Sequence, residues 1–215
     1  MSTEQASIQQ GSGDADIRVE FMKNLQAVTN KIHATSNIDE IMLELSEDVS
    51  SLFNADRLTI YSVSEDKTAI VSKVKTGLNS FKDLKLPIAD QSIAGYVALS
   101  RKMVNLKDVY DDVELKSHHQ GLRFLQEVDK RTGYRTKQML VGPVVTKDGD
   151  VVGVVQIINN KVGEPFSPLA EEGLRGLCET LAIAFSVRSK PGQAVKTKYD
   201  QLVAATSDRK ANEIQ

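Results

Sequence analysis

The chain has 215 residues, of which 40% are hydrophobic and 26% charged, and its formal net charge is -2. This composition is typical of a globular protein, and the length suits one domain with extensions. The charge gives no support for nucleic-acid binding, and no apolar run approaches the roughly 20 residues that a membrane span requires. The first residues, "MSTEQASIQQGSGDAD", lack the basic flank and apolar core of a signal peptide. We therefore expect a cytoplasmic protein that neither binds nucleic acid nor inserts into a membrane.

A single cysteine, Cys178, limits the chemistry that thiols could perform. It cannot form an internal disulfide, and a multi-thiolate metal site needs more sulfur ligands than the chain contains. Its surroundings, "LCETLAIAF", have the pattern of a buried helix face, where a free cysteine behaves as a small hydrophobic residue. The sequence therefore predicts a reducing compartment, no metal site and no bound cofactor.

Composition divides the chain into a central domain and two polar ends. Residues 1–14 are polar and contain glycine and serine, which predicts a disordered N-terminal tail. Residues 191–215 are also polar and predict a C-terminal tail or linker that begins at a Pro-Gly stop. The domain itself is expected to extend over residues 15–190.

Two amphipathic helices are predicted before the first strand. In the first, over residues 17–33, apolar residues recur at helical spacing: Ile17, Phe21, Leu25, Val28 and Ile32. In the second, Asn37 can cap the first turn and Glu40 can complete a capping box. The apolar residues of the second helix are Ile38, Ile41, Met42, Leu45, Val49 and Leu52.

Two β-hairpins follow from alternating apolar and polar residues. The first pairs residues 57–63 with 69–75, and the second pairs residues 138–146 with 150–159. The turn of the second hairpin, "KDGD", contains an Asp-Gly pair, which suits a tight turn with positive φ angles. Both hairpins should have one buried face.

Shorter elements connect the hairpins. We predict a short strand before Pro87, a short helix over residues 93–99 and a short strand over residues 103–106. Residues 108–121 indicate a loop with one helical turn. Gly95, inside the short helix, would let its backbone pack closely against a neighbour or a ligand.

The last helix completes the predicted architecture. Ser167 is its expected N-cap, and Pro168 occupies the first helical position. Five of its apolar residues should face inward or toward a partner: Leu174, Leu177, Leu181, Ile183 and Val187. The element order predicts an α+β fold in which an antiparallel sheet of about six strands carries the terminal helices on one face and loops on the other.

The long connection over residues 108–138 predicts a lid. Loops of this length are uncommon in a compact domain unless they cover a binding site or are disordered. This one is too rich in large apolar and aromatic residues for plain disorder: Tyr110, Leu115, Leu122, Phe124, Leu125 and Tyr134. We expect it to fold over one face of the sheet.

Three segments in this order resemble the GAF domain family: "SIAGYVALSRKMVNLKDVYDD", "TGYRTKQMLVGPVVTKDGDVVGVVQIIN" and "FSPLAEEGLRGLCETLAIAF". The resemblance covers roughly residues 28–188. It implies a regulatory module with a pocket on the loop side of the sheet, which in relatives can hold cyclic nucleotides, bilins or other small molecules. In their detailed sequence, these segments are most similar to GAF domains fused to type II secretion and type IV pilus ATPases, and more distantly to those of cyclic-nucleotide phosphodiesterases. "KYDQLVAA", residues 198–205, resembles the start of the module that follows in those ATPases.

The resemblance also supplies a motif for cyclic-nucleotide binding, which this chain matches in part. Asn159, Phe166 and Glu171 occupy motif positions, but the expected lysine is Asn160, with Lys161 one residue later, and the expected aspartate is Ala170. The family's Lys–Asp ion pair therefore cannot form at these positions. We interpret the three matching residues as structural: a strand end, a core residue and an acidic residue at a helix N-terminus.

Element order places a predicted pocket between the sheet and the lid. Its expected lining residues are Ile93, Ala94, Val109, Tyr110, Phe124, Tyr134, Thr136, Met139 and Gln156. Such pockets are mostly apolar with a few placed polar groups. The alternative is that Phe124 and its neighbours fill the space and the domain binds nothing.

The sequence gives little support for metal binding, bilin attachment or sulfoxide reduction. His118 and His119 are adjacent, so their side chains diverge and joint metal binding would need further ligands. A bilin would need a cysteine in the pocket loops, and the sulfoxide reductases built on the GAF fold need more than one cysteine. We predict no catalytic residue and no enzymatic activity.

The leading hypothesis is a sensory or regulatory domain that binds a small molecule, with nucleotides among the candidates. It would transmit the bound state through its terminal helices as a homodimer, and an output domain or ATPase is a candidate partner. The alternative is a ligand-free scaffold for protein interaction or dimerisation, or the N-terminal regulatory part of a secretion or pilus ATPase.

Overall fold

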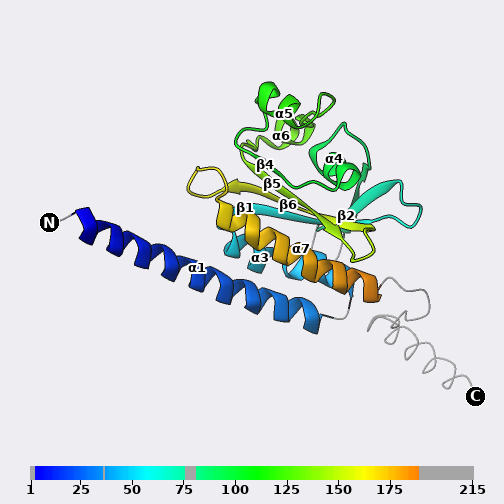
Figure 1. Cartoon of the computed structure of the whole chain (residues 1–215). Helices are drawn as coiled ribbons and strands as arrows, with labels where there is room; N and C mark the ends of the chain where they lie inside the picture. The colour runs from blue at the N-terminus through cyan, green and yellow to red at the C-terminus, as the bar shows by residue number, and fades with distance from the viewer. Residues whose placement is uncertain (1–2, 36, 76–80, 189–215) are drawn as a thin grey trace, which may run out of the picture.

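An antiparallel sheet carries helices on one face and a lid on the other, as the computed structural model shows for residues 3–35, 37–75 and 81–188 (Figure 1). The strands are β1 (Ala55–Val63), β2 (Ala69–Lys75), β3 (Phe81–Pro87), β4 (Val104–Leu106), β5 (Met139–Val145) and β6 (Val151–Asn160). The six strands lie in the order β3-β2-β1-β6-β5-β4, and each neighbouring pair is antiparallel. Both predicted hairpins are present, and the predicted α+β class is confirmed.

The central strands β1 and β6 divide two apolar cores. Alternate residues of a strand face opposite sides of a sheet. On β6, Val155 and Ile157 pack in the core on the helix side, whereas Val154 and Ile158 pack in the core on the lid side. The helices therefore bury one face of these strands, and the lid side buries the other.

Four helices cover one face of the sheet: α1 (Thr3–Ala34), α2 (Ile38–Glu44), α3 (Ser46–Leu52) and α7 (Pro168–Arg188). Their buried side chains include Val28, Ile32, Ile41, Val49, Leu174, Leu177, Leu181 and Phe185. Fully burying one such side chain contributes about 1.5–3 kcal/mol, so this face supplies much of the fold's stability. The predicted caps are present: Asn37 accepts a hydrogen bond from the Glu40 amide, and the Ser167 hydroxyl accepts one from the Ala170 amide.

Helix α1 runs alongside α7, and its N-terminal end projects past the sheet (Figure 1). Phe21 of α1 lies against Gly173 of α7, where an added Cβ would be only 2.4 Å from the phenyl Cζ. Arg18 of α1 forms an ion pair with Glu172 of α7 at 2.7 Å. Close approach at a glycine and a charge pair thus hold the two terminal helices together.

Two predictions about the helices were wrong. Helix α1 begins at Thr3 rather than Ile17, so most of the segment expected to be a disordered tail is helical. The predicted second helix is divided at Leu45 into α2 and α3. Ser46 accounts for the break, because its hydroxyl donates to the Met42 carbonyl at 2.7 Å and competes with the helical backbone pattern. Ile183 and Val187 of α7 are about half exposed, at 50% and 55%, so of the two predicted orientations the inward one is excluded and that toward a partner stays a prediction.

The other face of the sheet is covered by α4 (Ile93–Ser100) and by the lid, which contains two short helices, α5 (Asp112–His118) and α6 (Glu127–Thr132). The predicted lid is confirmed, although α6 was expected to be loop. Gly133, with a φ of 68°, ends α6 in the left-handed conformation that favours glycine. The predicted Pro-Gly stop after α7 and the segment 198–205 lie outside the described residues.

One edge of the sheet is only partly covered. Strand β4 has three residues and pairs with Met139, Leu140 and Val141 of β5. Pro143 lies on β5 beyond the last of these pairs.

Candidate functional site

A cavity of about 210 Å³ lies between the sheet and the lid. A single water molecule needs about 10–15 Å³ of such space, so the cavity can hold a small organic molecule. Its floor is formed by Arg57, Thr59, Tyr61, Met139, Gln156 and Ile158. Phe124 lines the cavity but does not fill it.

The floor follows from strand register. Arg57, Thr59 and Tyr61 are alternate residues of β1, so their side chains share the lid-facing side. Thr59 lies opposite Gln156 of β6, and Arg57 lies opposite Ile158. Three neighbouring strands therefore bring polar and apolar groups to one surface.

The N-terminal end of α4 forms part of the wall. Ser92 caps the helix, and its hydroxyl accepts a hydrogen bond from the Gly95 amide at 3.1 Å. Ile93 and Ala94 of the first turn line the cavity. Gly95 is required here because an added Cβ would lie 2.5 Å from the Pro87 carbonyl oxygen. Its close approach is thus to the protein's own backbone.

A buried carboxylate orders the lid around α6. Asp129 is 6% exposed, and its two oxygens accept hydrogen bonds from the Thr136 amide (2.7 Å), the Thr136 hydroxyl (2.8 Å) and the Tyr110 hydroxyl (3.0 Å). Buried carboxylates need such partners, because leaving them unpaired costs several kcal/mol. Asp129 therefore joins both ends of the lid.

Asn159 fastens the last part of the lid to the end of β6. Its side-chain oxygen accepts hydrogen bonds from the amides of Lys137 (2.7 Å) and Gln138 (3.2 Å). Its side-chain nitrogen donates to the Arg135 carbonyl and the Tyr134 hydroxyl, both at 2.8 Å. Asn159 has a φ of 52°, a left-handed conformation that asparagine tolerates better than most residues.

Two arginine–aromatic contacts flank this part of the lid. The Arg57 guanidinium lies 3.6 Å from the Tyr134 ring centroid, and that of Arg135 lies 3.4 Å from the Tyr110 ring centroid. Burial, followed by the neighbouring Asp56 carboxylate, raises the pKa of Tyr134. Burial and then the Asp129 carboxylate raise the pKa of Tyr110. Both phenols thus serve as neutral hydrogen-bond donors at ordinary pH.

The structure brings together most of the predicted pocket residues. Seven of the nine line the cavity: Ile93, Ala94, Phe124, Tyr134, Thr136, Met139 and Gln156. Two do not, which corrects the prediction: Val109 is fully buried in the lid-side core, and Tyr110 packs against Phe124 at a ring distance of 5.2 Å. That any of the seven contacts a ligand stays a prediction.

Sequence reasoning missed several lining residues. Arg57, Thr59 and Tyr61 follow the alternation of a strand that was itself predicted, so that pattern could have identified them. Leu84 and Leu86 come from β3, whose prediction was too short to give a face. Asp129 could not be found, because its partners lie elsewhere in the lid and the sequence gives no sign of α6.

The motif residues have structural partners. Phe166 is 4% exposed in the helix-side core. The Asn105 side-chain nitrogen donates to the Phe166 carbonyl (3.0 Å) and to a Glu171 carboxylate oxygen (2.7 Å). Ala170, in place of the family's aspartate, is 8% exposed and offers no charge. Asn105 thus joins β4 to the beginning of α7.

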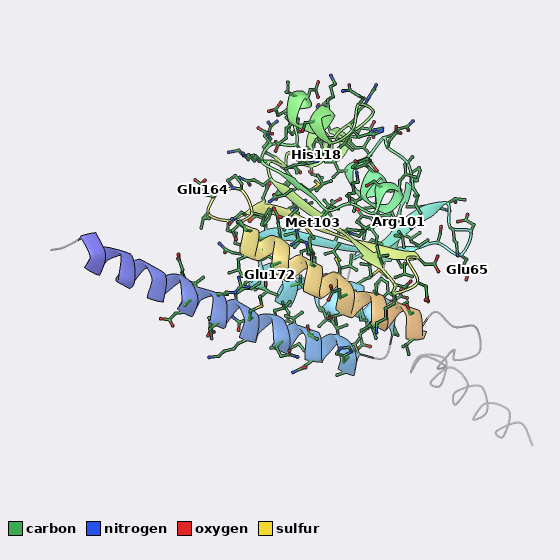
Figure 2. All side chains as sticks on the ribbon, viewed as in Figure 1. Glu65, Arg101, Met103, His118, Glu164 and Glu172 are labelled. Atoms are coloured by element: carbon green, nitrogen blue, oxygen red, sulfur yellow. The ribbon has the colours of Figure 1, made fainter. Side chains whose placement is uncertain are left out.

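The cysteine and the adjacent histidines lie apart from the cavity. Cys178 is 5% exposed on the helix side, and burial raises the pKa of its thiol. His118 belongs to the lid, on the opposite side of the sheet from Glu172 of α7 (Figure 2). His119 accepts a hydrogen bond at Nδ1 from the Gly121 amide at 3.1 Å. Among the described residues, no three histidine, cysteine or acidic side chains are grouped to hold a metal ion.

No helix within residues 3–35, 37–75 and 81–188 is both long enough and apolar enough to cross a bilayer.

Comparisons with known proteins agree with this geometry. A family model described as GAF domain matches residues 37–185. The chain is 30% identical over 193 residues to a dual 3′,5′-cyclic-AMP and -GMP phosphodiesterase 11A of Takifugu rubripes, covering 84% of the chain and 20% of that relative. It is 34% identical over 143 residues to the phosphodiesterase 11 of Drosophila melanogaster, covering 60% of the chain and 9% of the relative. The matched region is thus a small part of these curated relatives.

Solved structures share the fold. The GAF domain of an Acinetobacter phosphoenolpyruvate-protein phosphotransferase superposes with a TM-score of 0.60 at 18% identity, covering 87% of this chain and 95% of that one. A free methionine-R-sulfoxide reductase from Neisseria meningitidis superposes with a TM-score of 0.57 at 12% identity, covering 80% of this chain and 91% of that one. At such identities the likeness shows the fold alone. The family model, which spans more than half of the sequence, shows more: this chain belongs to the GAF domain family.

Proposed function

We propose that this GAF domain is a sensory module that binds a small molecule in the cavity beneath its lid. The observation that carries the proposal is the space of about 210 Å³ that the lid leaves above the sheet. A lid that served only to bury the sheet would be expected to fill that space, because protein interiors are closely packed.

Nucleotides are the first ligand class to test. Two similar proteins are named as cyclic-nucleotide phosphodiesterases, and the Arg57 guanidinium and the first turn of α4 line the cavity. Asn160 and Ala170 weigh against cyclic nucleotides, since the family's ion pair is missing. The ligand panel therefore includes compounds beyond the cyclic nucleotides.

We propose that ligand binding is transmitted out of the cavity along β6. A ligand that contacts both Gln156 and the lid would favour the closed lid, which Asn159 fastens to the end of β6. From there, residues 161–167 lead directly into α7. A ligand can shift this equilibrium only as far as it binds one arrangement better than another.

Thermal unfolding with a panel of cyclic mononucleotides, cyclic dinucleotides and a fractionated cell extract tests the proposal. A ligand at 100 times its Kd adds about 2.7 kcal/mol, which for a domain of this size raises Tm by roughly 5–10 °C. Thr59→Phe, which places a ring in the cavity, should abolish the shift. Val113→Ala, which alters an exposed lid residue far from the lining, should retain it. A native protein whose Tm responds to no compound or fraction would contradict the proposal.

We propose that the domain senses a ligand without catalysing a reaction, and that it does so in the cytoplasm. The sulfoxide reductase of similar fold is only 12% identical to this chain, so its catalytic activity is not inferred for this chain. Cys178 contacts the helix-side core, whereas the cavity lies on the lid side. A buried free thiol suits a reducing compartment.

A second candidate function is assembly through the terminal helices, with or without a ligand. Exposed apolar residues on the helices favour it: Ile17 and Val19 on α1, and Ile183 and Val187 on α7. We propose a homodimer that pairs these surfaces, with an output domain or an ATPase as a further partner.

A further inference from the structure

Gln156 is a partly buried polar side chain at the floor of the cavity. It lies at the centre of the floor, between Thr59 on β1 and Val141 on β5. Its neighbours along the same face of β6 are the apolar Val154 and Ile158. Within residues 3–35, 37–75 and 81–188, its carboxamide forms no hydrogen bond.

Several other polar groups of the lining bond to the protein itself. Asp129 and Thr136 bond to each other, and Ser92 caps α4. The Arg57 guanidinium lies on the Tyr134 ring, 3.6 Å from its centroid. Gln156 differs from these groups in offering an acceptor and donors side by side at the floor.

The Gln156 side chain is only partly buried, so water can reach its carboxamide, and a ligand that displaces this water gains most when it replaces the hydrogen bonds. Glutamine offers one carbonyl acceptor and two N–H donors side by side, so it pairs best with an edge that presents a donor beside an acceptor. Such edges occur in amides, lactams and nucleobases. The carboxamide is neutral, so it does not itself attract a phosphate or an ammonium group; the charge at the floor belongs to Arg57.

We infer that Gln156 determines ligand specificity by pairing with the amide-like edge of a flat, neutral ring system. The apolar side chains of Phe124, Met139 and Ile158 lie around the same cavity and can contact the faces of such a ring. This inference rests on the proposed sensory function, and it adds the ligand class and the residue that reads it. It places recognition on β6, the strand that continues to the lid fastening at Asn159.

The experiment compares hypoxanthine, which has a lactam edge, with purine, which has the same rings without it. In isotope-labelled protein, the side-chain amide signal of Gln156 is assigned by its disappearance in Gln156→Met. Hypoxanthine should shift this signal, and its Kd should weaken by about tenfold in Gln156→Met, as expected for loss of a paired hydrogen-bonding edge. Purine should bind both proteins equally. Guanosine 3′,5′-cyclic monophosphate carries a lactam edge on a nucleotide. Comparing its Kd with that of hypoxanthine shows whether the protein prefers a nucleotide or a free base.

Gln26→Met is the matched control, because Gln26 lies on α1 and donates to Asn30. It should leave hypoxanthine binding unchanged. Without ligand, Gln156→Met should keep Tm, since the change removes an amide that makes no bond to the described residues and leaves a side chain of similar length; a lowered Tm would assign the amide a structural role and overturn the inference. Equal binding of hypoxanthine to native protein and Gln156→Met would also overturn it, as would a failure of native protein to bind any lactam. In the last two cases the panel and extract experiment still decides the sensory function by itself.

Discussion

Asn159 shows how one residue can hold a lid in place. Its four hydrogen bonds all go to residues 134–138, and its left-handed φ turns the end of β6 toward them. The sequence predicted a strand end at this position, which the structure confirms. It could not predict the fastening, because the partners lie more than 20 residues away and their backbone path depends on α6.

Replacing Asn159 should loosen the lid. Asn159→Ala removes all four bonds and should lower the free energy of unfolding by about 2–4 kcal/mol, measured in urea. Asn159→Asp keeps the acceptor bonds to Lys137 and Gln138 and should cost less. Asn159→Gly is the control for backbone strain, since it favours the left-handed φ but lacks the side chain. Were Asn159→Gly as stable as the native protein, the side-chain bonds would not be what fastens the lid.

Asp66, in the β1–β2 turn, should give the fold a local acid sensitivity. Hydrogen bonds from the Ser64 hydroxyl (2.6 Å) and the Thr68 amide (3.1 Å) lower the pKa of Asp66 from 3.8 to about 2. Because the folded-state pKa is the lower one, the carboxylate stabilises the turn above pH 3.8, and this contribution is lost as the pH falls to about 2.

Carboxyl titration by NMR measures this directly. The Asp66 midpoint should be near 2 in the native protein and rise toward 3.8 in Ser64→Ala. Lys85→Ala should move it less, since that ammonium lies 3.9 Å away and is exposed. A native midpoint at 3.8 would mean that the turn does not hold the carboxylate as described.

At the scale of elements, the sequence predicted which helices and strands form, but it did not predict where every helix begins or breaks. Alternation identified both hairpins, and Ser167 with Pro168 located the start of α7 within a residue. The start of α1 was missed because residues 3–14 are polar and contain glycine, which by composition indicates disorder. The break at Leu45 depends on a single hydroxyl contact, and periodicity does not report such contacts.

The docking of α1 on α7 should depend on Gly173. Gly173→Ala improves helix propensity by about 1 kcal/mol, but its Cβ would meet the Phe21 ring, which also packs edge-on against Phe53. We expect α1 to be displaced and to become sensitive to protease while the sheet remains folded. Phe21→Ala combined with Gly173→Ala should be less destabilising than the two single changes added together. Simple additivity in this cycle would show that the two residues do not compete for space.

At the scale of the whole molecule, the exposed apolar residues of the terminal helices predict self-association. Sedimentation should give the mass of a dimer for the native chain. Ile183→Glu with Val187→Glu should shift it to a monomer, because carboxylates in an apolar interface lose their hydration. Val113→Glu is the control, since Val113 is 79% exposed but lies in the lid. A native monomer at high concentration would remove the assembly function and leave the sensory one.

The short β4 has a further consequence at the sheet edge. Beyond Val141, no further strand pairs with this side of β5 in the part of the chain that the structure describes, and an open edge of this kind can recruit strands from other chains into aggregates. Pro143 occupies this stretch and has no backbone N–H with which an incoming strand could pair. The protein thus keeps its open edge unreceptive to polymerisation by the covalent structure of one side chain, without adding a strand to close it.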